Sequence, residues 1–168
     1  MTRQQFLRDT LIAGSFLGMT GSTAWTQETQ TVPPLDKKLV AEFVGAGHRD
    51  FDKVKALLEE HPTLLNAAHD WTGGDFETAL GAASHVGYKK LAQYLIDQGA
   101  QANIFTACLF GRIDIVKPVL DFFPKTLHAK GPHGFTLLHH AERGGEEALE
   151  VKDYLLSLGA KETKVPLF

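Results

Sequence analysis

The side chains best suited to chemistry in this chain of 168 residues are its eight histidines, because imidazole binds metal ions and moves protons near neutral pH. They are His48, His61, His69, His85, His128, His133, His139 and His140. No pair has the His-Glu-x-x-His spacing that places two ring nitrogens on one helical face. A turn at residues 131–132 would bring His128, His133 and His140 together, but no carboxylate stands at a fixed spacing from them. We therefore predict no metal site.

Asp70, Asp75, Glu77 and His85 are the residues from which a catalytic acid–base site would be built. Carboxylates and a histidine exchange protons efficiently when their environments push their pKa values apart. Nothing in the spacing of these four residues fixes their geometry, so the pattern alone does not establish such a site.

Two aromatic side chains, Trp71 and Phe76, share the segment 69–78 with acidic residues and glycines. Exposed aromatics surrounded by polar groups are typical anchors of protein interfaces. In the alternative interpretation, Trp71 covers the exposed ends of neighbouring helices, and Asp75 or Thr78 caps a helix. The sequence leaves both interpretations open.

Nucleophilic and phosphate-binding motifs are absent from the sequence. There is no Gly-x-Ser-x-Gly elbow, and Ser84 and His85 are adjacent, so their side chains diverge on a helix. Gly144 and Gly145 are followed by two glutamates, which would repel a phosphate. Cys108 is the only cysteine, which excludes an internal disulfide and a cysteine zinc cluster, and it is expected to be a small buried hydrophobe. We predict that the protein is not an enzyme.

Composition and charge are those of an ordinary globular protein of one domain. The chain is 43% hydrophobic and 22% charged, which is too apolar for wholesale disorder. Its formal net charge of -3 provides no basic stripe for nucleic acid. We therefore expect neither a nucleic-acid partner nor a largely unfolded chain.

The N-terminal residues have the pattern of an export signal. Arg3 and Arg8 precede an apolar stretch that is too short to span a bilayer, and small residues precede a possible cleavage after Ala24. Residues 2–8, TRQQFLR in one-letter code, resemble the bacterial twin-arginine motif, although Gln4 replaces the second arginine. We predict a signal peptide over residues 1–24, by the twin-arginine or the general secretory route, and a disordered linker over 25–35. The mature protein would then be exported to the periplasm.

A repeated pair of helices organises the rest of the chain. Apolar residues at helical spacing, most clearly at 91, 94, 95 and 96 before Gly99, predict amphipathic helices that end at glycine. The pattern predicts longer helices at 50–58, 88–96, 111–120 and 151–156, each preceded by a shorter helix at 43–48, 78–86, 104–110 and 136–143. Such pairs bury one face only against their neighbours, so they stack into an array.

These residues resemble the ankyrin repeat. Thr136, His139 and Ala141 match the Thr-Pro-Leu-His-x-Ala pattern of that family, with Gly145 nine residues after the threonine. Thr78 begins a second copy, in which glycine replaces the histidine. The resemblance covers residues 36–161 as about four repeats and leaves 162–168 as a C-terminal tail. It implies an all-α, ankyrin-type helical-hairpin solenoid with short finger loops, and a structural hydrogen bond of His139 within its repeat.

The spacing of the repeats is irregular. The glycine frame advances from position 49 to Gly87, Gly111 and Gly145, by 38, 24 and 34 residues. The long first step inserts a loop over 66–75, and the short second step removes the connecting finger between the second and third repeats.

The resemblance implies a non-enzymatic, monomeric protein-binding module of the bacterial cell envelope, without a cofactor or a membrane span. Ankyrin proteins often use finger tips and inner helices for contact. The residues expected to bind an unidentified protein partner are Asp70, Trp71, Phe76, His133 and Phe135. The alternative is a periplasmic metal-binding accessory protein or a hydrolase that uses a His/Asp-rich face. A third possibility is that the protein is a structural or protective partner of an exported enzyme, and the sequence does not distinguish this role from the first.

Overall fold

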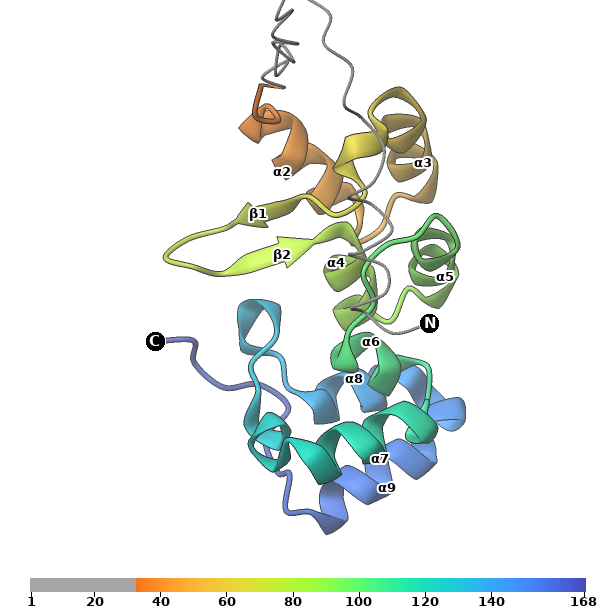
Figure 1. The fold of residues 1–168 in the computed structure, drawn as a ribbon, viewed down its shortest axis with the longest axis vertical. Coiled ribbons are helices and arrows are strands. Elements are labelled where there is room, and N and C mark those ends of the chain that lie inside the picture. Colours follow the sequence, from red (N-terminus) through yellow and green to blue (C-terminus); the bar gives the residue numbers. More distant parts are fainter. Residues whose placement is uncertain (1–32) are drawn as a thin grey trace, which may run out of the picture. The chain divides into compact units, whose positions relative to one another are not determined.

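The computed structural model describes residues 33–168, of which Pro34–Phe168 form one compact unit. The predicted signal peptide 1–24 and most of the predicted linker 25–35 lie outside the described residues. The helices are α2 (Lys37–Ala46), α3 (Phe51–Glu60), α4 (Ala79–Val86), α5 (Lys89–Asp97), α6 (Ile104–Leu109), α7 (Ile113–Phe122), α8 (Leu137–Gly144) and α9 (Leu149–Ser157), and the strands are β1 (Ala68–Asp70) and β2 (Phe76–Thr78) (Figure 1). Short 3-10 turns lie at Pro62–Leu64, Pro124–His128, Pro132–Gly134 and Gly145–Ala148.

The described unit is mostly helical, as the sequence predicts, but it is not all-α. The two strands form an antiparallel hairpin. β1 lies inside the segment 66–75 predicted as a loop, whereas β2 follows that segment and includes Thr78, the first residue of the predicted helix 78–86. In the described residues, no helix combines the length and the apolar character that a membrane crossing requires.

Local signals set the helix ends. The Thr78 hydroxyl accepts a hydrogen bond from the backbone N–H of Gly81 and so caps α4, and Gly87, with φ 79°, ends the same helix in the left-handed conformation. The first helix differs from its predicted range 43–48, because Asp36 caps it and starts it at Lys37. Because the helix ends at Ala46, His48 lies in the turn after α2 and not in the helix.

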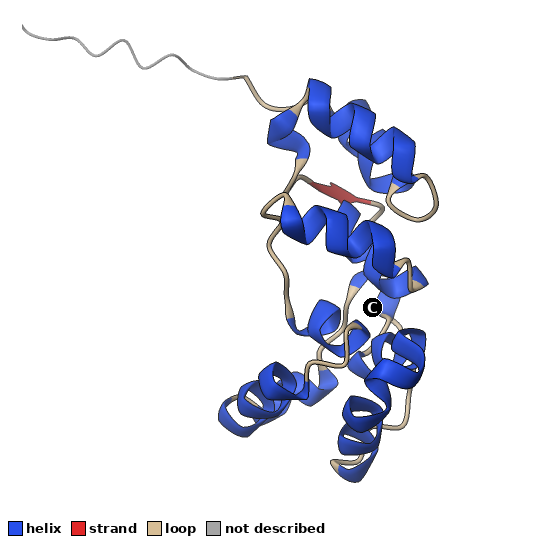
Figure 2. Cartoon of the chain, turned by 90° about the vertical axis from the view of Figure 1, so that its right-hand side faces the viewer, coloured by secondary structure: helices blue, strands red, loops and turns tan. Residues whose placement is uncertain are grey.

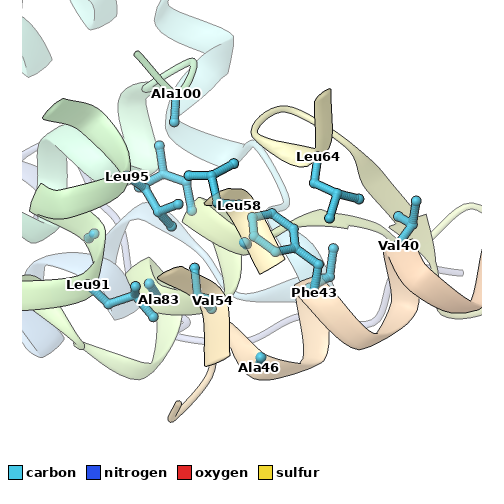
Figure 3. Close-up of a cluster of buried hydrophobic side chains, with 14 of the residues drawn as sticks. Val40, Phe43, Ala46, Val54, Leu58, Leu64, Ala83, Leu91, Leu95 and Ala100 are labelled. Carbon is cyan, nitrogen blue, oxygen red and sulfur yellow. The ribbon is translucent and has the colours of Figure 1, made fainter. Parts of the chain in front are cut away.

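The helices pack as consecutive pairs, α2 with α3, α4 with α5, α6 with α7 and α8 with α9. The first member of each pair also contacts the first member of the next, so α2, α4, α6 and α8 follow one another. One buried apolar cluster fills the first two pairs and includes Phe43, Leu58 and Leu95 (Figure 3). A second cluster around Val116 and Leu155 fills the last two pairs.

The β1–β2 hairpin lies between the first and second helical pairs (Figure 2) and contacts α2 through β1 and α4 through β2. Its register pairs His69 with Glu77 and Asp70 with Phe76. Because side chains alternate along a strand, Glu77 is buried while Phe76 is 62% exposed.

No comparable loop separates the second and third pairs. Only residues 98–103 connect α5 to α6, as the 24-residue step in the sequence predicts. The hairpin therefore lies next to the loop 129–136 that precedes α8, and the backbone N–H of His133 donates to the Asp75 carboxylate at 2.8 Å. The tail 162–168 packs along the same loop, where Val165 N–H donates to the carbonyl of Gly134 at 2.9 Å.

Candidate metal centre

Four side chains that are far apart in the sequence converge between the hairpin and the loop 129–136. They are His48, Glu77, His85 and His133, and one donor atom from each lies within 4.8 Å of the other three. His48 lies in the turn after α2, Glu77 in β2, His85 in the last turn of α4, and His133 in the 3-10 turn before α8. Packing of three helical pairs and the hairpin thus creates the cluster, and no local motif does.

The donor atoms are closely spaced. His85 Nε2 lies 2.9 Å from Glu77 Oε1 and 3.1 Å from His48 Nε2. Glu77 Oε2 lies 3.5 Å from both His48 Nε2 and His133 Nε2. Ligands about 2.0 Å from a tetrahedral metal ion stand about 3.3 Å apart. These four separations scatter around that value but involve both oxygens of Glu77, and one donor atom from each residue lies within 4.8 Å of the others.

Glu77 is the buried centre of the cluster, with a side chain that is 0% exposed. Its Oε2 accepts a hydrogen bond of 2.7 Å from Trp71 Nε1. Its Oε1, although close to His85, has no aligned hydrogen-bond partner among the described residues. Burial acts to raise the pKa of Glu77, but His85, Trp71 and His48 outweigh it and hold the pKa below its usual value. The carboxylate is therefore ionised near neutral pH, and its Oε1 faces His85 Nε2 at 2.9 Å.

Asp75 holds His133 at two points. Its Oδ1 accepts the backbone N–H of His133 at 2.8 Å, and its Oδ2 lies 2.6 Å from the ring Nδ1. Burial acts to raise the pKa of Asp75, but the hydrogen bonds from His133 lower it below its usual value. In the described residues His133 is the one non-glycine residue with a positive φ, 57°, which costs about 1 kcal/mol in an isolated chain.

Backbone contacts hold the ring of His48 and the main chain of His85. His48 Nδ1 lies 3.1 Å from the carbonyl oxygen of Gly45, which only accepts, so this nitrogen carries the hydrogen and Nε2 accepts. The carbonyl oxygen of His85 accepts a hydrogen bond from His139 Nε2 at 2.8 Å, which ties α4 to α8. His85 Nε2, which lies 3.1 Å from His48 Nε2 and 2.9 Å from Glu77 Oε1, is then the donor in the metal-free cluster.

Three imidazole nitrogens and one carboxylate oxygen form a donor set suited to Zn²⁺ and to neighbouring transition metals. Hard cations such as Mg²⁺ and Ca²⁺ prefer sites built from oxygen alone. Cys108 adds no thiolate, because it is buried elsewhere and burial raises the pKa of its thiol to about 12. The arrangement is therefore chemically able to hold one soft-to-borderline divalent ion.

The structure divides the residues expected to do acid–base chemistry. Asp75, Glu77 and His85 do come together, whereas Asp70 lies outside the cluster and its carboxylate accepts from the backbone N–H of Gly74 at 3.0 Å. Among the expected contact residues, Trp71 and His133 belong to the cluster or its immediate surroundings, and Phe135 stacks on the ring of His85 with centroids 5.0 Å apart.

Sequence reasoning missed His48 as a possible ligand and rejected a metal site because the spacing of the histidines contains no motif. His128 and His140 do not join His133, and His140 Nδ1 instead lies 2.7 Å from the carbonyl oxygen of Thr136. His139 also differs from expectation, since its side chain bonds the carbonyl of His85 in another helical pair. The short 24-residue step was the available signal, because it implies that the hairpin and the last loop come together.

A comparison with models of known protein families finds no match to this chain. A comparison with curated proteins finds none that is similar to it. The resemblance to ankyrin repeats therefore stays a prediction from the sequence.

Proposed function

We propose that this protein binds one divalent transition-metal ion, with Zn²⁺ as the best fit, through His48, Glu77, His85 and His133. The observation that carries the proposal is the convergence of the buried Glu77 carboxylate with three imidazoles, whose donor atoms lie within 4.8 Å of one another. The Oε1 of this carboxylate has no aligned hydrogen-bond donor among the described residues, and a metal ion would supply it with a partner.

The chemistry of the surroundings supports the same conclusion. Ligating histidines in metal sites commonly donate their second ring N–H to a carboxylate or a backbone carbonyl. His133 and His48 have those two partners, Asp75 and Gly45. With one carboxylate and three neutral imidazoles, the loaded site carries a net charge of +1, which is less than the charge of the ion alone.

We also infer that the four helical pairs form an ankyrin-type array and that residues 1–24 direct its export to the periplasm. The packing of α2, α4, α6 and α8 in succession supports the first inference. The charged and apolar pattern of residues 2–19 supports the second. In this proposal the array is a scaffold that fixes the metal ligands.

The test is metal analysis of the full chain after dialysis against Zn²⁺ and removal of free metal. We expect one ion per chain for the wild type and for His128→Ala, an exposed histidine outside the cluster. We expect His85→Ala to retain far less metal, because it removes a central ligand. Replacement by Co²⁺ adds a second measurement, since four-coordinate Co²⁺ has a strong visible absorption. The proposal would be contradicted if the wild type binds no ion, or if His85→Ala binds as much metal as the wild type.

A second function, protein binding, is favoured by one observation. Phe76 is 62% exposed on the face of β2 opposite Glu77, and Trp71 is 39% exposed at the end of β1. These aromatics and Asp70, which pairs with Phe76 across the hairpin, remain the proposed contact residues for a protein partner. Crosslinking of a photoreactive residue placed at position 76, compared with position 128, would test for a partner specific to the hairpin.

A further inference from the structure

We propose that Asp75 is the positioning residue of the metal centre: it selects the tautomer of His133 that leaves Nε2 free and aims that nitrogen at the ion. The proposal rests on the metal-binding function given above. It concerns a residue that supplies no donor atom to the cluster and acts only through His133.

The hydrogen bonding determines the tautomer. An ionised carboxylate only accepts hydrogen bonds, and Asp75 Oδ2 lies 2.6 Å from His133 Nδ1, so Nδ1 must carry the hydrogen. In the neutral ring Nε2 then holds the lone pair, and Nε2 is the atom that lies 3.5 Å from Glu77 Oε2. The opposite tautomer would place a hydrogen where the metal ion should bind.

The second contact of Asp75 fixes the backbone under the ring. Its Oδ1 accepts the N–H of His133, the residue that has the unusual φ of 57°. A non-glycine residue keeps this conformation only when its surroundings enforce it. Asp75 is 8% exposed and is itself held at the end of the hairpin turn, where its carbonyl accepts the N–H of Trp71 at 3.0 Å. One carboxylate thus sets the position, rotation and tautomer of the ligand from the last loop.

A purely structural role for Asp75 is the competing explanation, because the same contacts join the hairpin to the loop. The two roles differ in what happens to the ring of His133. A structural tie requires only that the loop stays in place, whereas a positioning role requires the Nδ1–H tautomer. The tautomer is directly measurable, because the two ring nitrogens of a ¹⁵N-labelled histidine have well separated chemical shifts according to which one carries the hydrogen.

The experiment compares the full-length wild type with Asp75→Asn and the control Asp70→Asn. Both substitutions remove one negative charge from the same hairpin, but Asp70 lies outside the cluster. Asparagine at 75 still accepts the backbone N–H through its oxygen, yet its amide NH₂ would face the Nδ1–H of His133. We expect Zn²⁺ affinity to fall about 10- to 100-fold in Asp75→Asn, and the visible spectrum of bound Co²⁺ to change. Asp70→Asn should match the wild type in both.

The ¹⁵N measurement is made first on the metal-free wild type near pH 8, and this first result does not depend on whether a variant folds. We expect His133 to be in the Nδ1–H form, and to lose that preference in Asp75→Asn. A wild-type Nε2–H tautomer, or unchanged Zn²⁺ affinity in a folded Asp75→Asn, overturns the role of Asp75. A wild type that binds no metal refutes the proposed function instead, and the tautomer result still stands on its own.

Discussion

Glu77→Gln is the substitution that separates the cost of the buried charge from its use as a ligand. The Glu77 side chain is fully buried, and its Oε1 lacks a hydrogen-bond partner among the described residues. The lowered pKa of Glu77 means that the folded protein favours its ionised form, through His85, Trp71 and His48. Glutamine keeps the shape, and its amide oxygen still accepts from Trp71, but it carries no charge. We therefore expect the metal-free variant to be less stable than the wild type, by about 1 kcal/mol.

Zinc should widen this difference. An ion that binds only the folded state adds about 2.7 kcal/mol to the free energy of unfolding when its free concentration is 100 times the Kd. If the loss of the carboxylate weakens binding about 100-fold, the same zinc concentration adds only about 0.4 kcal/mol to Glu77→Gln. At about 4 °C per kcal/mol, zinc should raise the melting temperature of the wild type by about 10 °C and that of the variant by about 2 °C.

The assay is thermal unfolding followed by circular dichroism, once with a chelator and once with buffered Zn²⁺. Glu59→Gln is the matched control, because Glu59 is an exposed residue that pairs only loosely with Lys55 at 3.8 Å. This control should change the free energy of unfolding by no more than about 0.5 kcal/mol, both with the chelator and with Zn²⁺. Equal zinc shifts in Glu77→Gln and the wild type would refute the assignment of Glu77 as a ligand. A metal-free Glu77→Gln that is more stable than the wild type would contradict the lowered pKa of this carboxylate.

Three further substitutions, two of them with a control substitution, test the surroundings of the centre. Burial of His140 lowers its pKa from 6.5 to about 4, so the folded protein resists protonation and loses stability as pH falls between those values, by about 3 kcal/mol in total. His140→Asn should remove most of that loss in urea unfolding at a series of pH values with a chelator present. Gly134→Ala should cost at least about 2 kcal/mol in urea unfolding, because φ is 77° and the new Cβ would lie 1.9 Å from the carbonyl oxygen of Val165. Gly159→Ala, with φ 96° and open space, should cost only about 1 kcal/mol. Trp71→Phe should weaken Zn²⁺ binding about 10-fold in a calorimetric titration, because Glu77 Oε2 loses its donor, whereas Phe76→Ala on the opposite face of the strand should leave it unchanged.

The helices were predictable because their signals are local. Amphipathic spacing, a threonine before each of α4 and α8, and a glycine shortly after α5 and α9 place the helical pairs within a few residues of their observed bounds. The start of α2 was missed, since its signal is the Asp36 cap before an apolar pattern that begins earlier than expected. The strands were missed because three-residue segments leave almost no periodic pattern.

The candidate site was only half predictable. Asp75, Glu77 and His85 are close together in the sequence, which suggests them as members of one acid–base site. His48 and His133 come from the first and last helical pairs, and nothing local connects them to that group. Only the stacking of the pairs, with a short link at 98–103, determines that all five meet.

The large distance in sequence between His48 and His133 also explains why a metal ion suits this fold. Most contacts between the described helical pairs join neighbouring pairs, apart from the contact of α4 with α8. The cluster adds a link between more distant segments, because His48 belongs to the first pair and His133 to the loop before the last. An ion held by both closes a long loop of chain, and its binding free energy becomes stability of the folded state. The hairpin, the left-handed turn at His133 and the tail that pairs with it are all joined to the array at this point, so metal occupancy should govern their order more than that of the outer helices.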